Sequence, residues 1–354
     1  MTPRIEVIDL VIRYGDVTAV GGVNFSIQPG ELVTLLGPSG CGKTSTLRAI
    51  AGLEDPSSGT IRLGGETMFS SAERRNVPTE KRRLSMVFQS YAIWPHMTVA
   101  ENVAYGLTLR KLPRAEVEQT VRRVLGMVRM DGYADRPASK LSGGQQQRVA
   151  VARAIAFSPT VLLFDEPLSN LDAKLRTEMR VEIRELQRQL DVTSVYVTHD
   201  QEEALAISDR IIVMDHGGIE QIGTPETIYN RPGSLFVADF VGAANLIQGG
   251  VGPDGVFETA GGVRLAVAEG GKPGGTTVAL RSSYVELRPD GAVVPDGMNV
   301  APGTIHRRMF HGDFIQYVVD WPPGQLIVRR PPTEMIAEGA PVRIVCAPEH
   351  CVLL

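Results

Sequence analysis

Residues 31–53 read ELVTLLGPSGCGKTSTLRAIAGL, and their order sets the architecture that we expect for the chain. A short apolar run comes first, a loop with three glycines follows, and a segment with helical spacing ends the stretch. A strand, a glycine-rich turn and a helix in this order match the phosphate-binding loop in both spacing and context. The stretch therefore predicts a nucleotide site at the end of a buried strand.

The loop itself, GPSGCGKT, occupies residues 37–44. Gly37, Gly40 and Gly42 allow the backbone to curl so that successive N–H groups and the helix N-terminus face one anion. Lys43 is expected to reach the β- and γ-phosphates, and Thr44 to place a hydroxyl on Mg²⁺.

Two acidic residues close a second apolar run, VLLFDEP, at residues 161–167. Asp165, at the end of a predicted buried strand, is expected to hold Mg²⁺ through water. Glu166 could polarise the attacking water as a general base, or help to position it. Two acids at a strand end are often surface or capping groups, but a phosphate loop in the same chain favours the catalytic interpretation.

Two further polar residues follow apolar runs. His199, in SVYVTHD, ends a third predicted strand and is expected within reach of the γ-phosphate. Gln89, in MVFQSYAIWPHMTV, could complete the Mg²⁺ shell with its amide oxygen. Either residue alone would have a structural role as readily as a chemical one.

The composition divides the chain into two regions. At 354 residues it favours two domains or more, and up to about residue 235 strand-like and helix-like segments alternate, which is typical of α/β architecture. The segment 172–190 has a helical apolar face formed by Leu175, Met179, Ile183, Leu186 and Leu190.

After about residue 242 glycine and proline become frequent, and FIQYVVDW (314–321) alternates polar and apolar positions, as half-buried strands do. We expect a small all-β barrel or sandwich there, and place the boundary near 240: a first domain at 1–240 and a second at 241–354.

Charge and cysteine content exclude several protein classes. A formal net charge of −4 and a pI near 5.9 argue against a nucleic-acid-binding protein. We find no apolar run near the ~20 residues of a membrane span and no signal-peptide core at the N-terminus. The three cysteines, Cys41, Cys346 and Cys351, suit a reducing cytoplasm. We therefore expect a cytoplasmic protein.

The stretch LSGGQQQR (141–148) contains no carboxylate, histidine or thiol. Its glycines permit a close approach of the backbone, and its serine and glutamines offer uncharged hydrogen bonds. Such a loop can recognise a ligand but does not catalyse alone.

Six motifs in order, GPSGCGKT, Gln89, LSGGQQQR, VLLFDEP, SNLD (169–172) and VTHD, resemble the nucleotide-binding subunit of an ATP-binding cassette (ABC) transporter. The resemblance covers residues 1 to about 235. Beyond 240 the chain is similar to the TOBE-type accessory domain of bacterial import ATPases, through phrases such as FVGAANLIQG and VALRSSYVELRP. The chain departs from the family pattern after Arg281. Members of the family often have a proline and an acidic residue at the next two positions, whereas this chain has Ser282 and Ser283.

The resemblance implies an α/β P-loop ATPase domain with a mostly parallel core sheet, an antiparallel β subdomain and a helical subdomain, followed by a small all-β, OB-like domain. It implies that Ser142, Gly143 and Gly144 close over the ATP held by a second copy of the chain. An uncharged helix N-terminus can bind that anion without a counter-ion.

The resemblance also suggests that Tyr14 stacks on adenine, although a half-buried strand tyrosine is the alternative, and that Asp172 communicates across the interface of the two copies. Catalysis is expected from Glu166, His199 and Lys43, and Mg²⁺ binding from Thr44, Gln89 and Asp165. The expected nucleotide-binding residues are Tyr14, Gly37, Pro38, Ser39, Gly40, Cys41, Gly42, Lys43, Thr44, Ser45, Gln89, Ser142, Gly143, Gly144, Gln145 and Asp172.

The implied function is an ATPase that drives solute import and lies on the inner face of the cell membrane. Its expected partners are a second copy, two permease subunits docking near residues 89–98, and indirectly an extracytoplasmic solute-binding protein. Ferric iron, polyamine or phosphonate-like solutes are favoured over sugar or sulfate. A soluble ABC ATPase unrelated to transport is the rival interpretation. The second domain is expected either to sense a ligand or partner, or only to widen the dimer interface.

Overall fold

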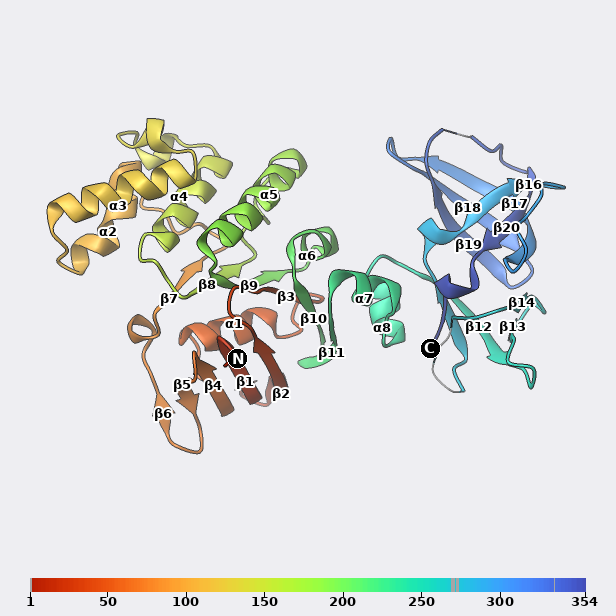
Figure 1. The fold of residues 1–354 in the computed structure, drawn as a ribbon, viewed down its shortest axis with the longest axis horizontal. Coiled ribbons are helices and arrows are strands. Elements are labelled where there is room, and N and C mark those ends of the chain that lie inside the picture. The colour runs from red at the N-terminus through yellow and green to blue at the C-terminus, as the bar shows by residue number, and fades with distance from the viewer. Residues whose placement is uncertain (1, 269–270, 272–273, 334) are drawn as a thin grey trace. The chain divides into compact units, whose positions relative to one another are not determined.

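The computed structural model describes residues 2–268, 271, 274–333 and 335–354. They form two compact units, Met1–Pro225 and Glu226–Leu354 (Figure 1), which are described separately.

The first unit is built on a six-stranded sheet in the order β11-β10-β3-β9-β8-β7. From β10 to β7 all neighbouring strands are parallel, and β11 pairs antiparallel with β10. Every residue of β3, β8 and β9 is buried, as their nearly continuous apolar sequences predict. The strands are β3 (Leu32–Leu36), β7 (Leu84–Val87), β8 (Val161–Asp165), β9 (Thr193–Thr198), β10 (Arg210–Asp215) and β11 (Gly218–Gly223). The mostly parallel core sheet is confirmed.

A second, antiparallel sheet has the order β2-β1-β4-β5-β6. Helix α1 (Lys43–Ala51) contacts β2 of this sheet and β7, β8 and β9 of the core sheet, so it lies between the two. The strands are β1 (Ile5–Tyr14), β2 (Val17–Ile27), β4 (Ser58–Leu63), β5 (Glu66–Ser70) and β6 (Arg75–Asn76).

Helices α2, α3 and α4 pack on one another as a helical subdomain (Figure 1). Helix α5 buries Met179, Ile183 and Leu186, the centre of its predicted apolar face. None of the described helices is long and apolar enough to cross a lipid bilayer. The helices are α2 (Val99–Leu109), α3 (Arg114–Met127), α4 (Gly143–Ile155), α5 (Ala173–Leu190) and α6 (Gln201–Ile207), with 3₁₀ turns at Thr79–Lys81, Asp131–Tyr133 and Ala138–Lys140.

The second unit contains two five-stranded antiparallel sheets around one apolar core, which confirms the predicted all-β region. The sheet orders are β14-β13-β12-β15-β21 and β16-β20-β17-β18-β19. The strands are β12 (Asn245–Val251), β13 (Phe257–Thr259), β14 (Arg264–Leu265), β15 (Thr277–Leu280), β16 (Glu286–Pro289), β17 (Asn299–Phe310), β18 (Ile315–Trp321), β19 (Gly324–Arg330), β20 (Pro341–Cys346) and β21 (Cys351–Leu353). The helices are α7 (Pro225–Asn230) and α8 (Leu235–Phe240), with 3₁₀ turns at Ser282–Tyr284 and Pro348–His350.

The two units divide near residue 225, earlier than the expected boundary near 240. Arg281, which follows β15, explains the difference. Its buried guanidinium donates hydrogen bonds to the backbone carbonyls of Tyr229, Ala238 and Val241. These bonds join α7 and α8 to the β-rich unit, whereas the local composition changes only after the helices end.

Candidate functional site

The phosphate loop joins β3 to α1, as its sequence predicts. Gly42 has φ +100°, and a Cβ there would lie 2.5 Å from the carbonyl oxygen of Ala19. Both the left-handed backbone and the close approach of β2 exclude a side chain at this position. Gly42 in turn is the N-cap of α1, so the loop brings the positive end of that helix to the strand end.

Lys43 is the first residue of α1 and only 4% of its surface is exposed. Its ammonium donates hydrogen bonds to the carbonyl oxygens of Gly37 and Pro38, both at 2.8 Å. Among the ion pairs of the described residues none involves Lys43. The ammonium also lies 3.7 Å from the Cys41 sulfur. A nearly buried cation whose contacts are two carbonyls and a thiol suits an anionic ligand as its counter-ion, and a nucleotide triphosphate fits.

Thr44 and Asp165 place two oxygen ligands beside this lysine. The Thr44 hydroxyl donates to Asp165 Oδ1 at 3.3 Å, and Arg48 Nη2 lies 3.4 Å from the other carboxylate oxygen. Burial raises the pKa of Asp165, although Arg48 and the Thr44 hydrogen bond lower it in part. Hydroxyl and carboxylate oxygens are hard ligands that suit Mg²⁺ when water and phosphate oxygens supply the other positions.

Glu166 and His199 meet at the carboxyl ends of the neighbouring parallel strands β8 and β9. His199 Nδ1 lies 3.2 Å from Glu166 Oε2. Glu166 has φ +44°, and its N–H donates to the carbonyl of Val197 at 3.1 Å, so the acidic residue turns toward β9 as β8 ends. The Glu166 side chain is 21% exposed and the His199 side chain is 55% exposed, which leaves the pair accessible to a ligand. Each residue was expected near the γ-phosphate, but their mutual contact was not foreseen.

Gln89 lies at the same edge of the sheet, two residues after β7, and is exposed. Its backbone carbonyl accepts a hydrogen bond from the Asn170 side chain at 2.9 Å. The hydroxyl of Ser169 donates to the carbonyl of Glu166 at 3.0 Å. The SNLD segment therefore connects Gln89 to Glu166, a link that no local pattern indicated.

Asp172 ends the SNLD segment and caps α5, since its carboxylate accepts the N–H of Leu175 at 3.0 Å. It is exposed.

The LSGGQ loop forms the N-terminus of α4 through a reciprocal cap. The Ser142 hydroxyl accepts the N–H of Gln145 at 3.4 Å, and the Gln145 side-chain oxygen accepts the N–H of Ser142 at 3.1 Å. A Cβ on Gly144 would lie 2.6 Å from Leu175 of α5, whereas one on Gly143 would make an ordinary 3.5 Å contact with Leu171. In the described chain no hydrogen bond connects residues 142–145 with residues 37–45.

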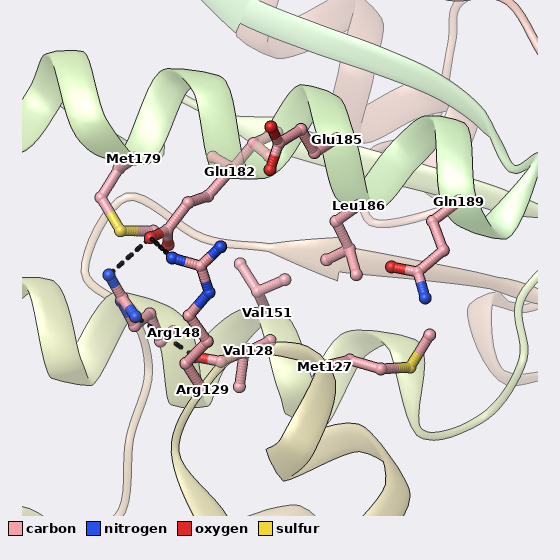
Figure 2. A pocket seen from close by; sticks show the side chains of 11 residues that line it. Met127, Val128, Arg129, Arg148, Val151, Met179, Glu182, Glu185, Leu186 and Gln189 are labelled. Carbon is pink, nitrogen blue, oxygen red and sulfur yellow. Dashed lines mark hydrogen bonds and ion pairs between the residues drawn. The ribbon is translucent and has the colours of Figure 1, made fainter.

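Arg148, the last residue of LSGGQQQR, contacts the body of the helical subdomain. Figure 2 shows it beside a hollow of about 110 Å³ among α3, α4 and α5. One terminal nitrogen lies 2.6 Å from Glu182 Oε1, the other donates to the carbonyl of Val128 at 3.4 Å, and Arg129 lies 3.9 Å from the same glutamate oxygen. Arg148 therefore holds α4 to α5.

Tyr14, the last residue of β1, is 52% exposed. Its hydroxyl lies 2.9 Å from the Ser45 hydroxyl and donates to the Glu54 carboxylate. Burial, followed by the Glu54 hydrogen bond, raises the pKa of Tyr14. These bonds fix the ring beside α1 while one half of the residue stays open to solvent, as a stacking platform requires.

Comparison with known proteins agrees with this arrangement. A family model described as ABC transporter matches residues 20–169, and one described as TOBE domain matches residues 278–354. The chain is 46% identical over 326 residues to the Fe(3+) ions import ATP-binding protein FbpC of Brucella abortus (strain 2308), covering 91% of this chain and 89% of the relative.

A second relative is the spermidine/putrescine import ATP-binding protein PotA of Rubrobacter xylanophilus. It is 42% identical over 352 residues, which cover 97% of this chain and 91% of the relative. Among solved structures, cbiO1 of Clostridium perfringens, part of the ABC transporter complex cbiONQ, superposes with a TM-score of 0.60 at 28% identity. That match covers 66% of this chain and 93% of the other.

Proposed function

Because this chain belongs to the family of ABC importer ATPase subunits with a TOBE domain, we propose that two copies of it clamp two MgATP molecules and couple their hydrolysis to ferric iron uptake. The observation that carries the site is the meeting of Glu166 and His199 at the carboxyl ends of β8 and β9. Asp165, next to Glu166, accepts a hydrogen bond from Thr44, which follows Lys43 in the phosphate loop. Ligands of α/β proteins bind at this edge of the sheet.

We propose the following roles for the residues of one chain. Lys43 and the N–H groups at the start of α1 bind the β- and γ-phosphates, and Tyr14 stacks on the adenine. Thr44, Asp165 and Gln89 hold Mg²⁺, which supplies positive charge against the phosphate oxygens when bound. Glu166 orients and polarises the attacking water, and His199 fixes Glu166 and the γ-phosphate.

The second copy completes each site. The Ser142 hydroxyl accepts one hydrogen bond within its own loop, and its proton remains available to donate to an anion. Together with the N–H groups of Gly143 and Gly144 it would cover the γ-phosphate held by the partner's phosphate loop. The closed pair binds ATP more tightly than the open pair, which is the condition for nucleotide to drive the closure.

The chain is the ATP-binding component of an importer complex, and so works with permease subunits. We place permease docking on the helical subdomain beside Gln89. Trp94 there packs on Tyr105 with ring centroids 4.5 Å apart, and Tyr105 and Leu109 are 40% and 67% exposed. Exposed aromatic and aliphatic side chains of this kind are typical of protein interfaces.

Ferric iron is the proposed cargo because an iron-import subunit matches 91% of this chain at 46% identity. A polyamine is the second candidate because the polyamine-import relative matches at 42%. The test is to purify the complete transporter and measure which solute-loaded binding protein stimulates its ATPase. Stimulation by the iron-loaded protein alone supports the proposal, and stimulation by the polyamine-loaded protein alone selects the second candidate. ATP hydrolysis without response to any binding protein would contradict the importer coupling.

A further inference from the structure

Glu203, on α6, is a buried carboxylate close to the candidate site but outside every motif considered above. It is 3% exposed. The Tyr196 hydroxyl and the Thr198 hydroxyl both donate to Glu203 Oε2, at 3.0 and 2.8 Å. Burial raises the pKa of Glu203, and the two hydrogen bonds lower it in part. A buried carboxyl group is costly unless donors satisfy it, so these two bonds tie α6 firmly to β9.

The two hydroxyls come from one face of β9, since residues two apart in a strand point the same way. Thr198 is the last residue of that strand, and His199 follows it directly. The Thr198 hydroxyl also accepts the N–H of Asp200 at 2.9 Å. Asp200 in turn caps α6 by accepting the N–H groups of residues 202 and 203. The residues before and after His199 are therefore both held, whereas its own side chain is 55% exposed.

Arg176, in the first turn of α5, contacts both Asp200 and Glu203. One terminal nitrogen lies 3.3 Å from Asp200 Oδ2, and the other donates to the carbonyl of Leu171 at 3.1 Å. Its Nε lies 3.8 Å from Glu203 Oε1. Glu203 thus sits between a cation on α5 and two hydroxyls on β9.

We propose that Glu203 is a positioning residue for ATP hydrolysis: through Thr198 it fixes the backbone of His199 so that the imidazole stays against Glu166. The inference rests on the proposed role of His199. Glu203 does not contact nucleotide and changes only the placement of a group that does. A misplacement of about 1 Å in such a group is enough to lower a rate by up to about 100-fold.

The chain offers a matched control on the same strand. Thr198 and Thr193 are both buried threonines, at opposite ends of β9. The Thr193 hydroxyl accepts the N–H of Gly30 at 2.9 Å. Thr198→Val and Thr193→Val each remove one hydroxyl from a buried position of β9 and leave one half-buried backbone N–H, of Asp200 or Gly30, without its acceptor. Thermal unfolding compares their effects on stability. Of the two threonines, only Thr198 is next to His199 in the chain.

The experiment measures kcat and KM for ATP in the full-length chain, with thermal unfolding of each variant. We expect Thr198→Val and Glu203→Leu to lower kcat about 10-fold while the KM for ATP stays within about two-fold. Thr198→Ser and Glu203→Gln retain the hydroxyl and an accepting oxygen, and are expected to keep most of the wild-type kcat. Thr193→Val should turn over like wild type.

A double-mutant cycle separates this inference from the proposed function. If Glu203 acts through Thr198 on His199, neither Glu203→Leu nor Thr198→Val should add a further loss to the residual kcat of His199→Ala. Full activity in His199→Ala would refute the role of His199 itself. A strongly reduced but measurable kcat in His199→Ala, together with wild-type turnover in folded Thr198→Val and Glu203→Leu, would overturn only the positioning role. Equal losses in Thr198→Val and Thr193→Val, or additive losses in the cycle, would do the same.

Discussion

His199 Nδ1 lies 3.2 Å from Glu166 Oε2, although the two residues are 33 positions apart. The contact exists because β8 and β9 are parallel neighbours, with Asp165 opposite Val197 in the register. When Nδ1 carries the proton it donates to the carboxylate, which orients the ring and leaves Nε2 free to face a ligand. The pair therefore places a carboxylate and an imidazole on one small region of the sheet edge.

Replacing Glu166 by Gln should separate ATP binding from hydrolysis. The amide keeps the size of the side chain but cannot take up a proton, so we expect kcat to fall at least ~100-fold while an ATP-bound dimer accumulates. Phosphate release and size-exclusion chromatography with MgATP measure the two effects. Glu202→Gln, at an exposed position of α6, is the control. Rapid turnover in Glu166→Gln would refute the assigned role.

Replacing Ser142 by Arg should block hydrolysis and spare nucleotide binding to one chain. The residue caps α4 and shares no hydrogen bond with the phosphate loop of its own chain, so the large side chain interferes only where a second copy approaches. We expect an unchanged Kd for ATP in dilute monomer and the absence of an ATP-dependent dimer in the Glu166→Gln background. A Kd raised in the monomer would show that the loop acts within one chain.

The two glycines of the LSGGQ loop should respond differently to alanine. Gly144→Ala places a Cβ 2.6 Å from Leu175, whereas Gly143→Ala makes a 3.5 Å contact. We expect Gly144→Ala to be less stable than Gly143→Ala by about 1 kcal/mol, because the Leu175 side chain must shift aside, whereas the gain in helix propensity is common to both. Urea denaturation compares them. Leu175→Ala in the Gly144→Ala background should restore part of the loss, and equal stability of the two single variants would contradict the packing role.

The raised pKa of Asp165 predicts how the free energy of unfolding depends on pH. Because burial raises its pKa, the folded chain holds this proton to a higher pH than the unfolded chain, whose carboxyl titrates near ~3.9. Between these two values the folded state binds more protons, so the free energy of unfolding falls as the pH rises.

Asp165→Asn removes this contribution. The stability of wild type relative to Asp165→Asn should therefore be highest below pH ~4 and decrease as the pH rises through the raised pKa. Urea denaturation without nucleotide at a series of pH values tests the sign, and a difference that stays constant would contradict it. Added MgATP should stabilise wild type more than Asp165→Asn, since the carboxylate is a proposed ligand of the metal.

Local patterns were sufficient for much of this molecule. The phosphate loop, the buried strands β3, β8, β9 and β10, and the apolar face of α5 each depend on residues close together in the chain, whose spacing matches the period of the element. The same is true of the change to an all-β region, because glycine, proline and alternating polarity are local properties. These features could be predicted from the amino-acid order alone.

Only the tertiary structure decided which distant groups meet. Strand order brought Glu166 to His199, the packing of α5 on α4 put Leu175 against Gly144, and the packing of α6 on β9 brought the Glu203 carboxylate to the Thr198 hydroxyl. The apolar run of a buried strand predicts that the strand is buried, but the same run would suit any neighbour in the sheet. Contacts across neighbouring strands and helices therefore had to be found in the folded chain.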